Sequence, residues 1–139
     1  MWLALETATD RASVAVGRTA ADAVEESLTG ARRHAGALLG MVEATLRRRG
    51  VGLEAITGLV VSDGPGSFTG LRVGATAAKA LARARGLPLR TAPSLMARAA
   101  GVAGEADSLV LAVSDALRGE VYVGGFRFGA RGVVTALEP

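Results

Sequence analysis

Residues 62–74 have the sequence Ser62-Asp63-Gly64-Pro65-Gly66-Ser67-Phe68-Thr69-Gly70-Leu71-Arg72-Val73-Gly74. The short β-branched apolar run before them, 58–61, predicts a buried strand. The Ala-rich segment after them, 71–85, contains no proline and predicts a helix. The stretch is therefore a joint between a strand and a helix. Gly64 and Gly66 allow the backbone to turn, Pro65 stiffens the turn, and either Ser67 or Thr69 can cap the helix.

A glycine-rich joint at a helix N-terminus can hold a phosphate, because unpaired N–H groups point outward there. The spacing does not match the known phosphate motifs. A Walker loop ends in Gly-Lys-Ser/Thr, whereas this chain has Thr69-Gly70-Leu71, and the third glycine of the Rossmann pattern falls on Thr69. Pro65 also removes one N–H donor. The favoured interpretation is a tight turn that lets the helix pack closely on a sheet.

The rest of the chain predicts an α/β fold. Strands at 2–5, 12–16 and 24–28 indicate a meander. A helix follows at 31–49, ended by Gly50, and its expected core stripe is Ala35, Leu38, Leu39, Val42 and Leu46. After the joint come a short strand in 86–91 and a third helix at 95–100. Alternating strands and helices predict parallel pairing through crossover helices.

A second part follows a Gly- and acid-rich linker at 101–107. Strands are expected at 108–113, 120–128 and 133–137, with a turn at 114–119. These strands form a predicted antiparallel meander that no helix covers, leaving six apolar side chains open: Val110, Val113, Val121, Val123, Phe126 and Phe128. The expected domains are therefore 1–103 and 108–139.

Composition limits the possible classes of protein. The 139 residues are enough for one hydrophobic core, half of them are hydrophobic, and there is no cysteine for disulfide or thiol chemistry. No apolar run reaches membrane-spanning length and the N-terminus lacks a signal-peptide layout, so a cytoplasmic protein is expected. The net charge is +3, and arginines cluster at 32–33, 47–49 and 83–85. They could contact RNA phosphates, but no aromatic side chains interleave with them, and solvated helix ends are the favoured interpretation.

No catalytic or metal site is predicted. There is one histidine, His34, so a site that needs paired histidines cannot be built. Ser67 does not lie in a G-x-S-x-G context, which argues against a serine hydrolase. Glu6, Thr7 and Thr9 lie where a degenerate nucleotide loop could stand, but Ala8 separates the hydroxyls and a structural polar turn is favoured. No cofactor is expected.

Five blocks occur in register: Glu6-Thr7-Ala8-Thr9, His34 at a helix start, residues 64–74, Ser94-Leu95-Met96, and residues 115–122. Together they resemble the TsaB (YeaZ) family, from the first residue to about Phe128. Two of the blocks, residues 64–74 and residues 115–122, are specific to this family. The signature residues within those two blocks are Gly64, Pro65, Gly66, Ser67, Phe68, Thr69, Gly70, Arg72, Asp115, Arg118, Gly119 and Glu120.

The resemblance implies an actin-like (ASKHA, ribonuclease H-like) lobe with a mixed sheet flanked by helices, followed by the start of a truncated second lobe. It also implies a non-catalytic scaffold subunit that works with the catalytic paralogue TsaD in N6-threonylcarbamoylation of adenosine 37 of ANN-decoding tRNAs. The TsaE ATPase joins that complex, and tRNA is contacted indirectly. The alternative is an actin-like ATPase or kinase relative that binds nucleotide weakly. Family chains usually have Asp at the position of Glu6 and continue beyond residue 139, so this chain is expected to be a fragment or a short member.

The expected partner interface lies on the first two helices. Gly70, Gly74, Ala77 and Leu81 are assigned to the sheet. A second line on the same helix, together with small residues of the first helix, is assigned to a four-helix seam with TsaD or a second copy; its members are Leu71, Ala75, Ala78, Ala82, Ala37, Met41 and Ala44. The alternative is that both lines are buried in the monomer. On the seam hypothesis, Ala78→Glu leaves the monomer folded and abolishes association.

Overall fold

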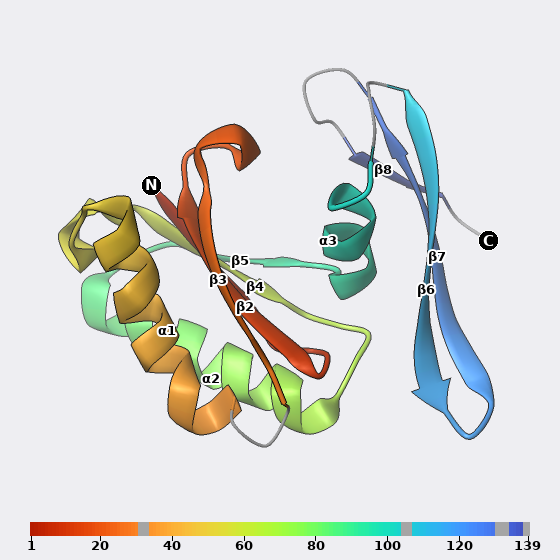
Figure 1. Cartoon of the computed structure of the whole chain (residues 1–139), viewed down its shortest axis with the longest axis horizontal. Coiled ribbons are helices and arrows are strands. Elements are labelled where there is room, and N and C mark those ends of the chain that lie inside the picture. Colours follow the sequence, from red (N-terminus) through yellow and green to blue (C-terminus); the bar gives the residue numbers. More distant parts are fainter. Residues whose placement is uncertain (31–33, 104–106, 130–133, 138–139) are drawn as a thin grey trace.

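The computed structural model describes residues 1–30, 34–103, 107–129 and 134–137. In these residues a five-stranded mixed sheet carries helices on one face, and a three-stranded antiparallel sheet stands beside it (Figure 1). The α/β class and the mixed sheet are as predicted. In chain order the elements are β1 (Trp2–Glu6), β2 (Arg11–Gly17), β3 (Val24–Thr29), α1 (His34–Arg49), β4 (Gly58–Ser62), α2 (Phe68–Arg85), β5 (Leu89–Ala92), α3 (Ser94–Ala100), β6 (Ser108–Leu117), β7 (Glu120–Phe128) and β8 (Val134–Leu137).

The first sheet has the strand order β3-β2-β1-β4-β5. The first three strands form the predicted antiparallel meander, and β1, β4 and β5 pair in parallel. Helix α1 crosses over from β3 to β4, and α2 crosses over from β4 to β5. Both crossover helices lie on the same side of this sheet (Figure 1). The predicted strand–helix alternation and its parallel pairing are therefore confirmed.

The two faces of the first sheet differ in side-chain size. In register, Leu3 lies between Val16 and Leu59, and these large side chains are buried under the helices. The neighbouring register position places the small Ala4 between Ala15 and Val60 on the opposite face. The main core therefore lies between the sheet and the two helices, and its other large members are Leu5, Val14, Val61, Leu38, Val42, Leu46 and Ile56.

The core stripe of α1 is narrower than predicted. Leu38, Val42 and Leu46 are buried as expected, but 57% of the Leu39 surface is exposed, so its assignment to the core was wrong. The buried Thr45 lies on the core side instead, and its hydroxyl donates to the carbonyl of Met41 at 2.7 Å. Gly50 ends the helix as predicted, with φ of 72°. The expected helical start at 31–33 and the side chain of Ala35 lie outside the described residues.

Helix α2 begins at Phe68, three residues before the predicted start, because Ser67 caps it. The Ser67 hydroxyl accepts a hydrogen bond from the backbone N–H of Gly70 at 3.3 Å. The buried line of the helix is Gly70, Gly74, Ala78 and Ala82. The predicted line continued instead through Ala77 and Leu81, which are only partly buried but still pack against the main core.

The second sheet is the predicted meander β6-β7-β8. The predicted turn at 114–119 is shorter than expected, because β6 continues to Leu117 and the hairpin turns at Arg118 and Gly119, both with positive φ. One face is covered by α3, since Leu95 and Ala99 form a core with Ala112, Phe126 and Phe128. The prediction that Val110, Phe126 and Phe128 lack a covering helix was wrong, whereas the exposure predicted for Val113, Val121 and Val123 is confirmed. Because α3 shares this second core, we propose that the domain boundary lies before Ser94 rather than at 103–108.

Candidate functional site

The glycine-rich joint packs directly against the end of β1. A Cβ on Gly70 would collide with the carbonyl oxygen of Thr7, and one on Gly66 would collide with that of Ala8. The Thr7 hydroxyl, fully buried, donates to the Gly70 carbonyl at 2.8 Å, and the Ser67 N–H donates to the Ala8 carbonyl at 2.7 Å. The glycines of this block thus allow helix and strand to approach closely, in agreement with the interpretation favoured from the sequence.

The polar turn after β1 uses its own groups for local hydrogen bonds. One carboxylate oxygen of Glu6 accepts from the Ala8 N–H at 2.6 Å and from the Ser62 hydroxyl at 2.8 Å. The Thr9 hydroxyl donates to the Arg11 carbonyl at 2.9 Å and accepts from the Arg11 N–H at 3.2 Å. These bonds, with that of Thr7, support a structural polar turn rather than a nucleotide loop. The second oxygen of Glu6 is buried without a hydrogen-bond partner among the described residues.

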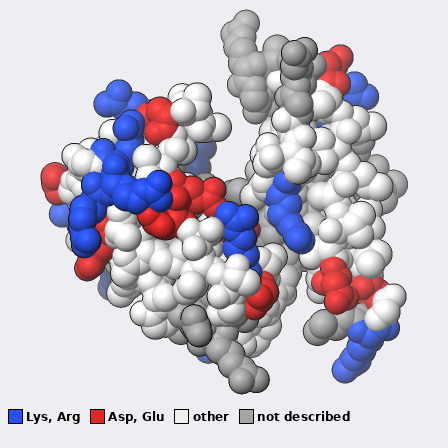
Figure 2. All heavy atoms as spheres, in the orientation of Figure 1, with Lys and Arg blue, Asp and Glu red and all other residues white. Residues whose placement is uncertain are grey.

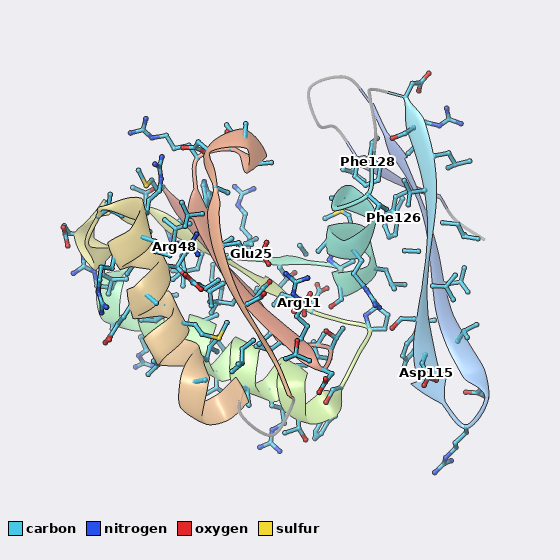
Figure 3. All side chains as sticks on the ribbon, in the orientation of Figure 1. Arg11, Glu25, Arg48, Asp115, Phe126 and Phe128 are labelled. Carbon is cyan, nitrogen blue, oxygen red and sulfur yellow. The ribbon has the colours of Figure 1, made fainter. Side chains whose placement is uncertain are left out.

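A hollow of about 1000 Å³ lies where the two signature blocks face each other. The first block contributes four residues to its wall and the second block three: Gly66, Ser67, Phe68, Thr69, Asp115, Ala116 and Tyr122. Arg11 and Asp115 reach toward it from the two sheets (Figure 3). The other signature residues of the second block, Arg118, Gly119 and Glu120, lie at the exposed hairpin tip and do not line it. The structure therefore brings together only part of the predicted signature set.

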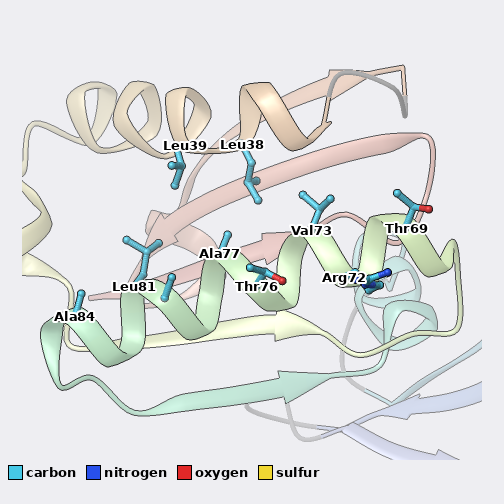
Figure 4. Close-up of a pocket in the computed structure, with 10 residues that line it drawn as sticks. Leu38, Leu39, Thr69, Arg72, Val73, Thr76, Ala77, Leu81 and Ala84 are labelled. Atoms are coloured by element: carbon cyan, nitrogen blue, oxygen red, sulfur yellow. The ribbon is translucent and has the colours of Figure 1, made fainter.

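An apolar groove of about 720 Å³ runs between α1 and α2 (Figure 4). Leu38 and Leu39 project from α1 toward Val73, Ala77 and Leu81 on α2. The remaining wall residues, all on α2, are Thr69, Arg72, Thr76, Ala80 and Ala84. We call these ten residues the helix groove. Its walls are mostly aliphatic and small, with Arg72 as the charged group.

The N-terminal end of the helix groove carries a ring contact. The Arg72 guanidinium lies 5.5 Å from the centroid of the Phe68 ring, a distance at which a cation is attracted to the ring face. Phe68 is 74% exposed, although an aromatic side chain of that size is usually buried. An exposed aromatic residue beside an arginine is typical of the centre of protein–protein contacts.

The seven predicted interface residues do not line the helix groove. Ala78 is fully buried and Ala82 is 8% exposed, both in the main core, so their assignment to an exposed seam was wrong. Leu71 and Ala75 lie on another side of α2, in a separate hollow beside β4 and β5. Met41 packs against the main core, and Ala37 and Ala44 are partly exposed on α1.

No sequence signal indicated that the buried line of α2 continues through Ala78 rather than Ala77, although Gly70 and Gly74 were correctly assigned to the sheet-facing side. Both need close approach to Thr7, so they fix the sheet-facing side of α2. Each step of four residues advances by about 40° around a helix, so the observed buried line from Gly70 to Ala82 turns by about 120° along α2. Ala77 and Leu81 then fall on the adjacent side, which faces the helix groove.

Acidic side chains on and before β3 pair with the arginines that end α1. Arg48 lies 2.5 Å from Glu26, and Arg49 lies 2.8 Å from Asp22. The backbone N–H groups of Thr19 and Arg18 hold the pKa of Asp22 down, to about 2, with Arg49 contributing less. Basic and acidic atoms accordingly alternate over this face in Figure 2. This pairing weakens the case for an RNA contact through Arg48 and Arg49.

Neither a metal site nor a membrane span is found in the part of the chain that the structure describes. No three histidine, cysteine or acidic side chains there stand close enough together to hold a metal ion. None of the described helices is long and apolar enough to cross a membrane. The side chain of His34, the single histidine, lies outside the described residues.

Comparison with known proteins gives consistent matches. The family model for TsaD, tRNA N6-adenosine threonylcarbamoyltransferase, matches residues 25–138. The tRNA threonylcarbamoyladenosine biosynthesis protein TsaB of Haemophilus influenzae is 38% identical over 122 residues, covering 86% of this chain and 51% of the relative. TsaB of Escherichia coli is 36% identical over 132 residues, covering 94% of this chain and 57% of the relative.

Among solved structures, YeaZ from Pseudomonas aeruginosa superimposes with a TM-score of 0.85 at 33% sequence identity. This match covers 99% of the present chain and 64% of the YeaZ chain. The chain thus spans between about half and two thirds of the length of the relatives that it matches.

Proposed function

This chain belongs to the TsaB (YeaZ) family, and from that premise we propose that it acts in forming N6-threonylcarbamoyladenosine at position 37 of ANN-decoding tRNAs. Its role is that of a non-catalytic scaffold subunit, needed by the catalytic subunit TsaD. The proposal is supported by the similarity to two tRNA threonylcarbamoyladenosine biosynthesis proteins, both named TsaB, and by the fold match to YeaZ. On this proposal the first sheet with α1 and α2 is an actin-like lobe, and α3 with the second sheet begins a second lobe.

The helix groove is the observation that carries the scaffold role. Its walls combine the exposed Leu39 with the partly buried Val73 and Leu81, so apolar surface remains open to solvent along both helices. Contiguous exposed apolar surface is a mark of a protein–protein contact. The seam that we predicted on α1 and α2 is therefore proposed again, on the groove side of α2 instead of the line through Ala78.

TsaD is the proposed occupant of the helix groove. The family model that matches residues 25–138 is the one for TsaD, and α1 and α2 lie within this range, so a corresponding helix pair in TsaD is part of the proposal. Two such pairs can pack as four helices and bury on the order of 800 Å² on each partner, the size of a specific interface. A second copy of this chain offers the same surface and competes for it. TsaE and tRNA then bind the assembled complex rather than this subunit alone.

Weak nucleotide binding is the second candidate. The hollow of about 1000 Å³ between the signature blocks is large enough for a nucleotide and is lined by Arg11 and Arg98. Against it, the hydroxyls of Thr7 and Thr9 are already used in local hydrogen bonds. Titration calorimetry with ATP and magnesium tests this candidate, and a measurable heat of binding would favour it.

Co-purification with TsaD of the same organism tests the scaffold role. Leu39→Glu and Ala80→Glu each place a carboxylate on the helix groove at an exposed position, so both variants should fold and lose TsaD. Ala100→Glu is the matched control, since it makes the same change at an exposed alanine of α3 outside the groove. Retention of TsaD by both groove variants would show that the interface lies elsewhere.

An activity assay separates the scaffold from an enzyme. Threonylcarbamoyl transfer to tRNA is measured with this chain alone, with TsaD alone and with both. We expect no transfer or peptidase activity from this chain alone, because it lacks a histidine pair, a cysteine and a credible triad. Turnover by the isolated chain would contradict the proposal.

A further inference from the structure

Strand β5 ends the first sheet and has a free edge. Its other edge pairs with β4, and the carbonyls of Pro88 and Ala92 accept hydrogen bonds there, at 2.9 Å and 3.1 Å. Because backbone groups alternate along a strand, the N–H and C=O groups of Leu89 and Thr91 point away from β4. Among the described residues no further strand pairs with β5 on that side (Figure 1). The edge therefore offers two donors and two acceptors to an added strand.

A hollow of about 340 Å³ lies beside this edge, on the side of the sheet that carries the helices. Leu89 and Thr91 line it from β5, and Leu71, Ala75 and Lys79 line it from α2. Leu71 and Ala75 are only partly buried, so apolar surface remains open next to the free edge. Directly opposite side chains of neighbouring strands share one face of a sheet. A strand added to β5 would therefore place every second side chain over this hollow.

The surroundings of the free edge are basic. Arg90 is exposed on the other face of β5, where its guanidinium lies 5.7 Å from the centroid of the Trp2 ring. Lys79 is exposed at the hollow, and Asp63 is the only carboxylate among the residues that line it. In the described part of the chain, neither Arg90 nor Lys79 forms an ion pair. Unpaired cations on both faces of the edge favour a strand with acidic side chains.

A second copy of this chain is a poor occupant of the edge. Two copies related by a two-fold axis would pair their β5 strands antiparallel. The register that aligns Leu89 with Thr91 then places the Arg90 side chains of the two copies opposite each other, and like charges in that position destabilise a strand pair. Pro88 and Pro93 flank the strand, so the pairing cannot slide far to another register. The charge of the edge therefore favours a different chain.

We propose that the free edge of β5 binds an extended acidic segment of a partner protein as a sixth strand of the first sheet. The segment forms hydrogen bonds with the outward backbone groups of β5 and places apolar side chains over the hollow. Its acidic side chains lie next to Lys79 and Arg90. Strand addition takes affinity from main-chain hydrogen bonds and specificity from alternate side chains. The hollow shares only Arg72 with the helix groove, so this site is separate from the proposed contact with TsaD.

The probe is a fluorescein-labelled hexapeptide that alternates valine and glutamate, and a peptide that alternates valine and lysine is its control. Fluorescence anisotropy with the full 139-residue chain should show saturable binding of the glutamate peptide, with a Kd below about 1 mM. Binding should weaken when the salt is raised from about 0.1 M to about 1 M. Amide exchange at Leu89 and Thr91 should slow when the peptide is added. Absence of saturable binding, equal binding of the two peptides, or unchanged exchange at both amides would overturn the proposal.

Thr91→Pro tests the hydrogen bonds of the added strand. It removes an N–H that points away from β4, a position where an edge strand tolerates proline. Affinity for the glutamate peptide should fall by roughly fivefold to tenfold. Thr91→Val keeps the N–H and should bind as the parent chain does. Equal affinity of Thr91→Pro and the parent chain would refute strand addition at this edge.

Lys79→Glu tests the charge and also serves if circular dichroism shows that Thr91→Pro does not fold. It should weaken binding of the glutamate peptide by roughly twofold to fivefold. Arg47→Glu is the matched control, since it makes the same charge change at an exposed position of α1 outside the hollow. Equal effects of these two variants would contradict a site at β5.

Ala80→Glu separates this inference from the proposed function. It adds a carboxylate to the helix groove, so it should lose TsaD and still bind the peptide as the parent chain does. Loss of the peptide in Ala80→Glu would place the peptide in the groove and overturn the proposal. Light scattering of the chain alone is the last measurement. A dimer that Thr91→Pro breaks would show a second copy on the edge, which is also incompatible with the proposal.

Discussion

Replacing Gly70 by alanine tests the central packing contact of this fold. The added Cβ would meet the carbonyl oxygen of Thr7, which belongs to the backbone and cannot rotate away. Either the start of α2 moves outward or the end of β1 shifts. Both movements disturb the hydrogen bond from the Thr7 hydroxyl to the Gly70 carbonyl, which is 2.8 Å long and buried. The same movement displaces Thr69 and Arg72, which line the helix groove.

The expected destabilisation combines three contributions. Overpacking in a well-packed core costs about 1 to 3 kcal/mol. Loss of the Thr7 hydrogen bond costs about 1 kcal/mol. The better helix propensity of alanine returns less than about 1 kcal/mol, because Gly70 lies in the first turn. Gly70→Ala should therefore lower the free energy of unfolding by about 2 to 3 kcal/mol.

Urea unfolding followed by the fluorescence of Trp2 measures this change. Trp2 is the single tryptophan and lies in β1, so its signal reports the sheet that Gly70 packs against. With a urea m-value of about 1 to 3 kcal/mol per molar, the midpoint should fall by roughly 1 to 2 M. Gly40→Ala is the control, because Gly40 is an exposed position of α1 with no atom within 4 Å of the built Cβ. It should be stabilising by about 0.5 to 1 kcal/mol.

The two glycine variants should thus change stability in opposite directions. Gly74→Ala should lie between them, because its Cβ would meet side-chain atoms of Thr7 and Val61 that can adjust. If Gly70→Ala were as stable as the parent chain, the close packing of α2 on β1 would not be the reason for the glycine at position 70.

Further predictions concern other parts of the chain. Ala78→Glu should unfold the chain as judged by circular dichroism, because an unpaired carboxylate in the main core costs several kcal/mol; a folded variant would contradict the burial of Ala78. Asp22 has a pKa of about 2 against an ordinary 3.8, so its contribution to stability is present above about pH 4 and is lost as the pH falls toward 2. Asp22→Asn should make acid unfolding curves flatter in that window, and an unchanged curve would argue against it. Phe126→Ala should cost about 3 to 5 kcal/mol in the second core, seen as faster amide exchange in α3, and unchanged exchange there would refute the pairing of α3 with this sheet. Amides in 108–137 of the isolated chain should exchange faster than those in 59–61, and equal protection would mean that the second sheet is covered.

The sequence by itself determined the elements and their order. The β-branched run at 58–61, the glycine-rich joint and the Ala-rich segment after it gave one strand–turn–helix unit, because strand and helix formation depend on nearby residues. The meander at the N-terminus and the parallel pairing followed from element order and crossover rules. The family could also be identified from local blocks of sequence. Gly66 and Gly70 belong to one of these blocks, and both are glycine because a side chain there would collide with the backbone of Ala8 or Thr7.

The tertiary structure alone decided which side of each helix is open. Neighbouring sides of α2 both carry alanines, so periodicity could not distinguish Ala77 from Ala78. The burial of Ala78 in the main core distinguishes them, and the contacts of α2 with the sheet join residues more than sixty positions apart, as Thr7 and Gly70 do. The same holds for Leu39, which has the spacing of a core residue but faces the helix groove, and for α3, which packs on the second sheet rather than the first. Burial depends on contacts distant in sequence, and a local pattern does not contain them.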